Sequence, residues 1–130
     1  MPAAPLPDGF RAALGEAEQV LVSSRSAGRE LTVPMSFALS RSGGLFLMTS
    51  AFSRKVRRWE RDPWVRVGVA GTALSLEGTV STVDPGELDP DEAGAVLERF
   101  ITSGAATPEA LRELLGVGTH LLLRVDPAWS

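Results

Sequence analysis

A short segment in the first half of the chain combines three kinds of anion-binding group. Its hydroxyl and cationic side chains are those of Thr49, Ser50, Ser53, Arg54 and Lys55. The apolar run before it predicts a strand and the residues after it predict a helix, so a helix N-terminus adds unpaired N–H groups. Because arginine offers a planar fork and lysine a compact charge, the two cations can hold one phosphate from two directions. The segment therefore predicts a phosphate site.

The same region allows two other interpretations, and the residues alone leave both open. The basic residues of the run are Arg54, Lys55, Arg57, Arg58 and Arg61. They could form the solvated face of a short helix that has Ser53 as its N-cap. Together with Trp59 and Trp64 they could also form a nucleic-acid patch. The net charge of −3 and the lack of a second basic element argue against the patch, so we expect no nucleic-acid partner.

The only histidine, His120, lies on an apolar terminal run. A general base or a haem ligand is conceivable there, but a structural role is the main expectation. With no second histidine and no cysteine, a two-histidine or thiolate metal site is excluded.

Acidic residues cluster later in the chain, where a metal site has to be considered. They are Asp84, Glu87, Asp89, Asp91 and Glu92. Pro85, Gly86 and Pro90 lie among them, which is typical of a turn followed by a capped helix start. We therefore expect no metal at this cluster.

The clearest predicted strand covers residues 31–40. Its apolar side chains alternate with small and polar ones, so they share one face of a strand. Pro34 interrupts the pattern because proline cannot donate to a β-ladder. It predicts an edge, a bulge, or a place where something other than a strand lies alongside.

The remaining patterns predict a mainly β protein with flanking helices. Helices are expected from Asp8, over 53–61, from 89 to a stop at Gly104, and over 107–116. Further strands are expected at 20–22, 45–48, 65–69, 74–83 and 121–125. About six strands joined mostly by short turns indicate an antiparallel barrel.

Composition sets the outer limits of this interpretation. With 130 residues and 44% apolar content, the chain is expected to form one domain over 1–130, with residues 1–7 as a loose lead-in. No run approaches a membrane span of about 18 apolar residues. The first residues lack a signal-peptide pattern, so the expected location is the cytoplasm.

Several motifs, taken in order, resemble the core of the pyridoxamine 5'-phosphate oxidase-like superfamily. They are 31–37 (LTVPMSF), 44–49 (GLFLMT), 53–56 (SRKV), 61–65 (RDPWV) and 76–80 (LEGTV). The resemblance covers about half the chain. It implies a six-stranded antiparallel split barrel of the FMN-binding type. It also implies a homodimer with FMN, or alternatively a deazaflavin coenzyme, in a groove between the subunits.

The resemblance also assigns residues to the coenzyme. Ser53, Arg54 and Lys55 would grip its phosphate, with Met48, Thr49 and Ser50 beside them. Pro34, Met35 and Ser36 would lie along the ring. Trp59 and Trp64 could stack on the ring or on the partner subunit, although ordinary packing is the main expectation.

Two departures from the family pattern concern the reaction. Val33 stands where pyridoxamine 5'-phosphate oxidases carry an arginine, and Ala73 stands where they carry a glutamine. The chain is more similar to small flavin- or deazaflavin-dependent reductases that act on an unknown small molecule. Hydride transfer would then belong to the coenzyme, and no catalytic side chain is assigned. The alternative is a non-catalytic module that binds a flavin, a deazaflavin or another phosphate ligand.

Overall fold

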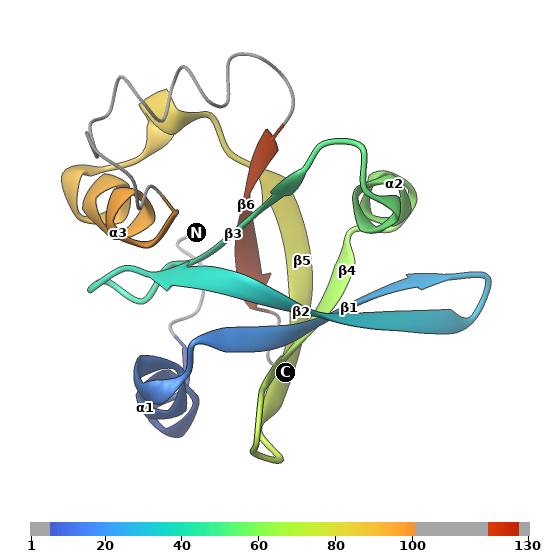
Figure 1. Cartoon of the computed structure of the whole chain (residues 1–130), viewed down its shortest axis with the longest axis horizontal. Coiled ribbons are helices and arrows are strands. Elements are labelled where there is room, and N and C mark those ends of the chain that lie inside the picture. Colours follow the sequence, from blue (N-terminus) through green and yellow to red (C-terminus); the bar gives the residue numbers. More distant parts are fainter. Residues whose placement is uncertain (1–5, 101–119, 128–130) are drawn as a thin grey trace.

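The computed structural model describes residues 6–100 and 120–127. Six antiparallel strands form a closed barrel in the order β1-β2-β3-β6-β5-β4, and β4 pairs with β1 to close it (Figure 1). The strands are β1 Gln19–Ser26, β2 Arg29–Leu39, β3 Leu45–Ser50, β4 Trp64–Val69, β5 Ser75–Thr82 and β6 His120–Pro127. The predicted six-stranded antiparallel barrel is confirmed.

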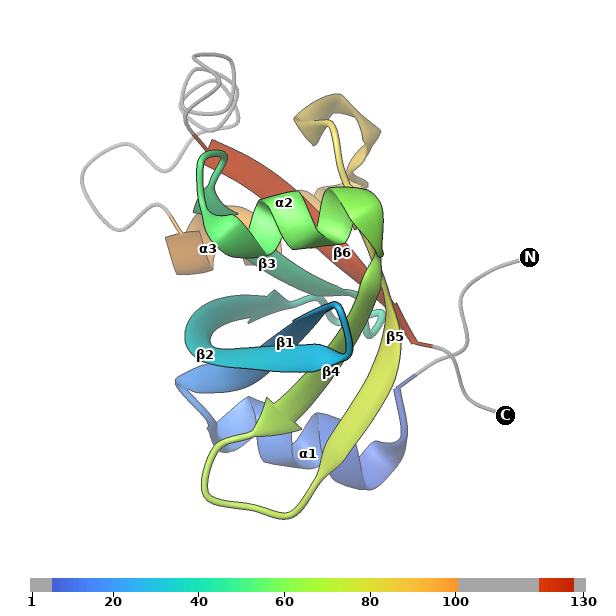
Figure 2. The ribbon, with the colours of Figure 1, turned by 90° about the vertical axis from the view of Figure 1, so that its right-hand side faces the viewer.

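Within the described residues three α-helices flank the barrel: α1 Asp8–Glu16, α2 Arg54–Arg61 and α3 Pro90–Phe100. Figures 1 and 2 show α1 and α2 at opposite ends of the barrel. The N-terminus of α3 has the predicted cap. The Glu92 N–H donates to the Asp89 carboxylate at 2.8 Å, and the Asp89 N–H donates to Glu92 at 3.2 Å. The predicted stop at Gly104 and the predicted helix over 107–116 lie outside the described residues.

The barrel interior is filled by the inward side chains of alternating strand positions. Along β4, Val65, Val67 and Val69 are buried while the residues between them are partly exposed. A second apolar cluster lies outside the barrel, between the sheet and α3, where Phe46 and Val96 are fully buried. The core thus fixes both the barrel and the position of α3.

The first strand is longer than its apolar residues predicted, because polar residues extend it. Ser23 in β1 and Thr32 in β2 share a hydrogen bond of 2.7 Å, and the two strands pair as far as Ser26 and Arg29. A two-residue turn, Ala27 and Gly28, joins them. This hairpin extends beyond the barrel beside α2 (Figure 1).

The pairing of β2 changes along its length. From Arg29 to Ser36 it pairs with β1, whereas β3 joins its other edge only over Phe37–Leu39. Pro34 lies opposite Leu21 of β1, and no described strand pairs with its other edge. The prediction that Pro34 marks a gap in strand pairing is therefore confirmed for that edge.

Candidate functional site

The predicted site residues lie on the two sides of an opening between β2 and β3. The last pair between these strands is Phe37 with Leu47. If the register continued, three further pairs would form: Ser36 with Met48, Met35 with Thr49, and Pro34 with Ser50. Instead the two strands diverge, β2 toward its hairpin with β1 and β3 toward α2 (Figure 1). We call this place the β2–β3 opening.

The two groups of residues that the resemblance assigned to the ring and to the strand end thus flank one opening. Met35 and Thr49 are buried, at 7% and 8% exposure, because they point into the barrel. Pro34, Ser36 and Ser50 are exposed, and Met48 is half-buried. Side chains on both strands therefore alternate between the barrel interior and the outside, as expected for β-strands.

A tight turn connects β3 to α2 at the end of the opening. The Ser53 N–H donates to the Ser50 carbonyl at 3.2 Å, and the Ser50 hydroxyl accepts from the Phe52 N–H at 3.3 Å. Ser53 occupies the N-cap position of α2 with extended backbone angles. The turn therefore brings the hydroxyls of Ser50 and Ser53 to the start of the helix, whereas the third predicted hydroxyl, that of Thr49, points into the barrel.

The hydroxyl of Ser53 is buried and has no hydrogen-bond partner within the described part of the chain. It makes no capping bond, so the predicted N-cap is confirmed for its backbone position only. A buried polar group without a partner costs about 1–3 kcal/mol. No acidic residue lies in the first turn of α2 to offset the positive end of the helix. This corner accordingly favours an anionic acceptor.

Arg54 and Lys55 follow directly but point in different directions, because consecutive helix residues differ by about 100°. Arg54 is exposed, whereas Lys55 is half-buried. Burial lowers the pKa of the Lys55 ammonium. The ion pairs of the described residues include neither cation. Their joint grip on one phosphate remains a prediction.

His120 lies beside the predicted site, which the sequence reasoning did not foresee. It pairs with Ser50 across β3 and β6. The sequence placed it correctly on the last strand, but only strand order brings that strand next to β3. Predicting that His120 lies at this site would have required knowing that β6 pairs with β3.

The two tryptophans near α2 have structural partners. Trp59 is buried, at 6% exposure, and its indole N–H donates to the Trp64 carbonyl at 3.1 Å. Trp64 lies under the guanidinium groups of Arg25 and Arg66, 4.7 and 5.1 Å from its ring centroid. Its indole N–H donates to Glu77 at 2.8 Å. Trp59 is therefore packed in the core, whereas Trp64 is half-buried, and its stacking on a ring or on a partner subunit stays a prediction.

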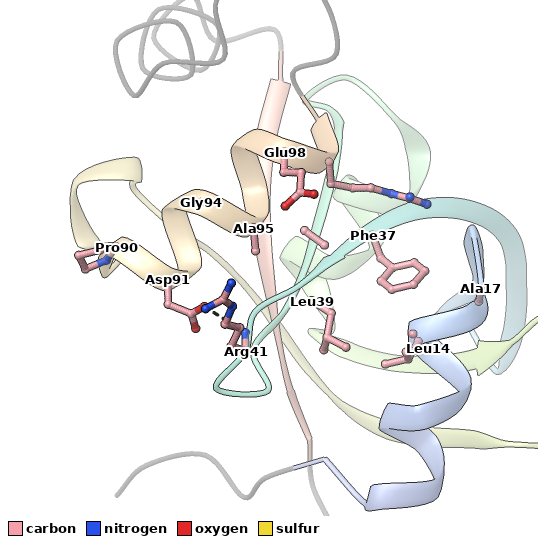
Figure 3. Close-up of a pocket in the computed structure, with 13 residues that line it drawn as sticks. Leu14, Ala17, Phe37, Leu39, Arg41, Pro90, Asp91, Gly94, Ala95 and Glu98 are labelled. Carbon is pink, nitrogen blue, oxygen red and sulfur yellow. Dashed lines mark hydrogen bonds between the residues drawn. The ribbon is translucent and has the colours of Figure 1, made fainter.

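A pocket of about 920 Å³ lies between α1, β2 and α3 (Figure 3). Leu14, Phe37 and Leu39 give it an apolar wall, and Asp91 lies at its edge beside Arg41. The Asp91 carboxylate accepts the backbone N–H groups of Ser42 and Arg41 at 3.1 Å each, which lowers its pKa. None of the nine predicted coenzyme-binding residues lines this pocket.

A second groove, of about 800 Å³, lies between α2 and the turn of the β1–β2 hairpin. It is lined by Arg25, Ser26, Ala27, Gly28, Arg54, Arg57, Arg58, Arg61 and Asp62. We call it the arginine groove. Among the predicted coenzyme-binding residues only Arg54 lines it, so it adjoins the β2–β3 opening through that residue.

The described residues contain neither a metal-binding cluster nor a helix that could span a membrane. No group of three or more histidine, cysteine, aspartate or glutamate side chains among them could hold a metal ion. In the same residues, no helix has the length and apolar character needed to cross a membrane.

Comparison with known proteins extends the fold assignment. No protein family profile matches the sequence, and no characterised protein matches it significantly. Solved structures do match. A candidate pyridoxamine 5'-phosphate oxidase from Listeria innocua aligns with a TM-score of 0.64 and 18% identity, over 94% of this chain and 93% of its own.

Two other structures carry different ligand names. HutZ, a haem storage protein from Vibrio cholerae, aligns with a TM-score of 0.62 and 18% identity, over 98% of this chain and 93% of its own. An FAD-binding protein from Mesorhizobium loti aligns with a TM-score of 0.59 and 16% identity, over 99% of this chain and 95% of its own.

The fold defines this chain as a split-barrel protein. It shares this fold with the solved structures named above, as the order of its sequence motifs predicted.

Proposed function

We propose that the chain binds a flavin-type coenzyme, FMN or a deazaflavin, at the β2–β3 opening and uses it as an oxidoreductase. One observation carries the proposal. The ladder between β2 and β3 ends at Phe37 and Leu47, and β3 continues from there to the turn before α2, where the Ser53 hydroxyl is buried without a hydrogen-bond partner among the described residues. A ring and a phosphate on one ligand match these two features.

The residues at the opening suit such a ligand. Ser53 and the free N–H groups at the start of α2 would hold the phosphate, with charge supplied by Arg54 and Lys55. The unpaired edge of β2 at Pro34, Met35 and Ser36 leaves backbone polar groups that would orient the ring. Met48, Thr49 and Ser50 would form the opposite side.

The bound coenzyme would supply the hydride chemistry. The chain's own residues would anchor the phosphate, fix the ring against β2 and shape the space for a second small molecule. We also propose a homodimer. Pro34, Ser36 and Ser50 are exposed, and a second copy packed over them would exclude water from the ring.

Absorbance and titration of the purified protein test the coenzyme. FMN and a deazaflavin would each be titrated, followed by their fluorescence, into the wild type and into the double variant Arg54→Ala/Lys55→Ala. The matched control is Arg11→Ala/Arg41→Ala, which removes the same charge from the α1 side of the barrel. We expect retention by the control and loss in the first variant. Equal affinity of all three proteins for the coenzyme would show that Arg54 and Lys55 of α2 do not belong to the site.

Activity needs its own measurement. Reduction of the bound coenzyme by a nicotinamide or by a reduced deazaflavin, followed by electron transfer to a quinone, would support an oxidoreductase. Tight binding without reduction by either donor would favour the non-catalytic module.

A non-catalytic haem-binding role is the second candidate, favoured by the position of His120. This residue pairs with Ser50 at the opening, and one neighbour of the same fold is a haem storage protein. An imidazole is a common haem ligand. Haem titration with an intense Soret band that is lost in His120→Ala, together with no flavin binding, would favour this candidate.

A further inference from the structure

The outer face of α2 carries a row of arginines that the proposed coenzyme site does not use in full. Arg54, Arg57, Arg58 and Arg61 follow the i, i+3, i+4, i+7 spacing of one helix face and line the arginine groove. Val56 and Trp59 occupy the opposite, buried face. The row is therefore aimed away from the barrel, toward the β1–β2 turn.

The charge of this groove is almost entirely positive. Among its described lining residues Asp62 is the one acid, and it is paired with Arg25 through a contact of 2.6 Å between the Arg25 Nε and a carboxylate oxygen. The four arginines of α2 make none of the ion pairs found among the described residues. In all, α2 contains five basic residues and one acidic residue, although the whole chain has a net charge of −3.

Such a row is unfavourable in the free protein. Arg54 faces Arg58, and Arg57 faces Arg61, at the i, i+4 spacing where like charges destabilise a helix. Arg54 and Lys55 in the first turn also oppose the helix dipole, whereas Arg58 and Arg61 in the last turn interact favourably with it. A bound anion would relieve the repulsion between the arginines and the unfavourable interaction with the dipole. A helix face that only contacts solvent would have no such compensation for its lack of acidic residues.

We propose that the arginine groove binds a ligand with two or more linked phosphate groups. The row from Arg54 to Arg61 extends about 10 Å along the helix, which is longer than one phosphate can bridge. Guanidinium forks bind phosphate oxygens in pairs, and the groove's volume of about 800 Å³ lies within the range of small-molecule sites. Nucleotide polyphosphates and phosphate-linked dinucleotides share this chemistry.

This subsite does not rest on the proposed coenzyme function. Arg57 and Arg61 line the groove but are not among the residues proposed to hold the coenzyme phosphate. The double variant Arg57→Ala/Arg61→Ala therefore separates the two proposals. Its matched control is again Arg11→Ala/Arg41→Ala, which has the same net charge.

Calorimetric titration at constant ionic strength tests the subsite with inorganic orthophosphate, pyrophosphate and tripolyphosphate. We expect affinity to rise with each added phosphate, and the Arg57→Ala/Arg61→Ala variant to lose about tenfold for tripolyphosphate, the equivalent of two exposed charge contacts. The control should bind as the wild type does. FMN or deazaflavin retention should persist in both variants.

Further arms identify the source of the phosphates and guard against misfolding. NADPH and FAD would be compared for binding that depends on Arg57 and Arg61, and circular dichroism would confirm that the variants fold. Equal affinity for orthophosphate and tripolyphosphate would overturn the proposal, as would wild-type affinity in the arginine variant. An oligonucleotide that binds more tightly than tripolyphosphate through the same arginines would replace it with a nucleic-acid surface.

Discussion

The indole N–H of Trp59 donates a hydrogen bond of 3.1 Å to the backbone carbonyl of Trp64, and this contact ties α2 to the first residue of β4. Only Val56 and Trp59 of α2 are buried. The helix that carries both proposed anion sites is therefore held by two apolar side chains, one indole bond and, at its C-cap, the ion pair of Asp62 with Arg25.

We expect Trp59→Phe to lower the free energy of unfolding by about 1–2 kcal/mol, since it removes one hydrogen bond and leaves a small void. Coenzyme affinity should fall as well, because α2 loses its tie to β4. Denaturant unfolding and coenzyme titration measure the two effects. Trp64→Phe, which removes the bond to Glu77 instead, is the control expected to leave affinity unchanged. Unaltered stability in Trp59→Phe would show that this bond does not hold the helix.

Removing the charge of Lys55 should change the stability of the protein and its affinity for the coenzyme in opposite directions. Burial lowers the pKa of its ammonium, so the charge is held in the free protein at a cost. Lys55→Met keeps the length of the side chain and removes the charge. We expect the unfolding free energy of the free protein to rise by up to about 1 kcal/mol and coenzyme affinity to fall.

Thermal unfolding and fluorescence titration of one preparation of Lys55→Met test this pair of effects. Lys55→Arg keeps the charge and should preserve binding better than the methionine variant does. A methionine variant that binds the coenzyme as tightly as the wild type would exclude Lys55 from the phosphate site.

The sequence predicted the barrel well because its signals were local. Alternation marked β2 and β4, turns separated the strands, and Asp89 with Glu92 formed the expected cap. The missing proline N–H at Pro34 even located the free edge of β2. Each of these signals acts within a few residues along the chain.

Relationships between distant segments could not be predicted in the same way. That β2 and β3 pair through only three residues depends on where the β1–β2 hairpin and α2 pack. His120 meets Ser50 only because β6 inserts between β3 and β5. The arginine spacing of α2 was visible in the sequence, but the hairpin turn at Ala27 and Gly28 that faces it lies far away along the chain.

The turn at the tip of the β1–β2 hairpin contains a strained residue. Ala27 has a φ of 51° and Gly28 a φ of 78°, and these positive values fit the type I′ turn that two-residue hairpins favour. An alanine in the left-handed region costs about 1–2 kcal/mol. Asparagine tolerates that region, so Ala27→Asn should raise the unfolding free energy by about 0.5–1 kcal/mol.

Thermal unfolding followed by circular dichroism measures this gain. Gly28→Ala is the opposite control, since it adds a side chain at positive φ and should destabilise the hairpin. A lower melting temperature in Ala27→Asn than in the wild type would mean that the turn has another conformation in solution.

Asp91 makes stability depend on pH at the β2–β3 turn. The N–H of Ser42, followed by the N–H of Arg41, lowers the pKa of its carboxyl below the ordinary value. A carboxyl whose pKa is lower in the folded state stabilises the protein above its unfolded pKa, and that contribution disappears as the pH falls through the folded value. The wild type should therefore lose stability in acid, below about pH 4.

Asp91→Asn should be less stable than the wild type at pH 7 and should lose less stability on acidification. Denaturant midpoints at pH 7 and pH 3, with the exposed Glu18→Gln as control, measure the difference, and parallel curves for Asp91→Asn and the wild type would contradict this role for the carboxylate.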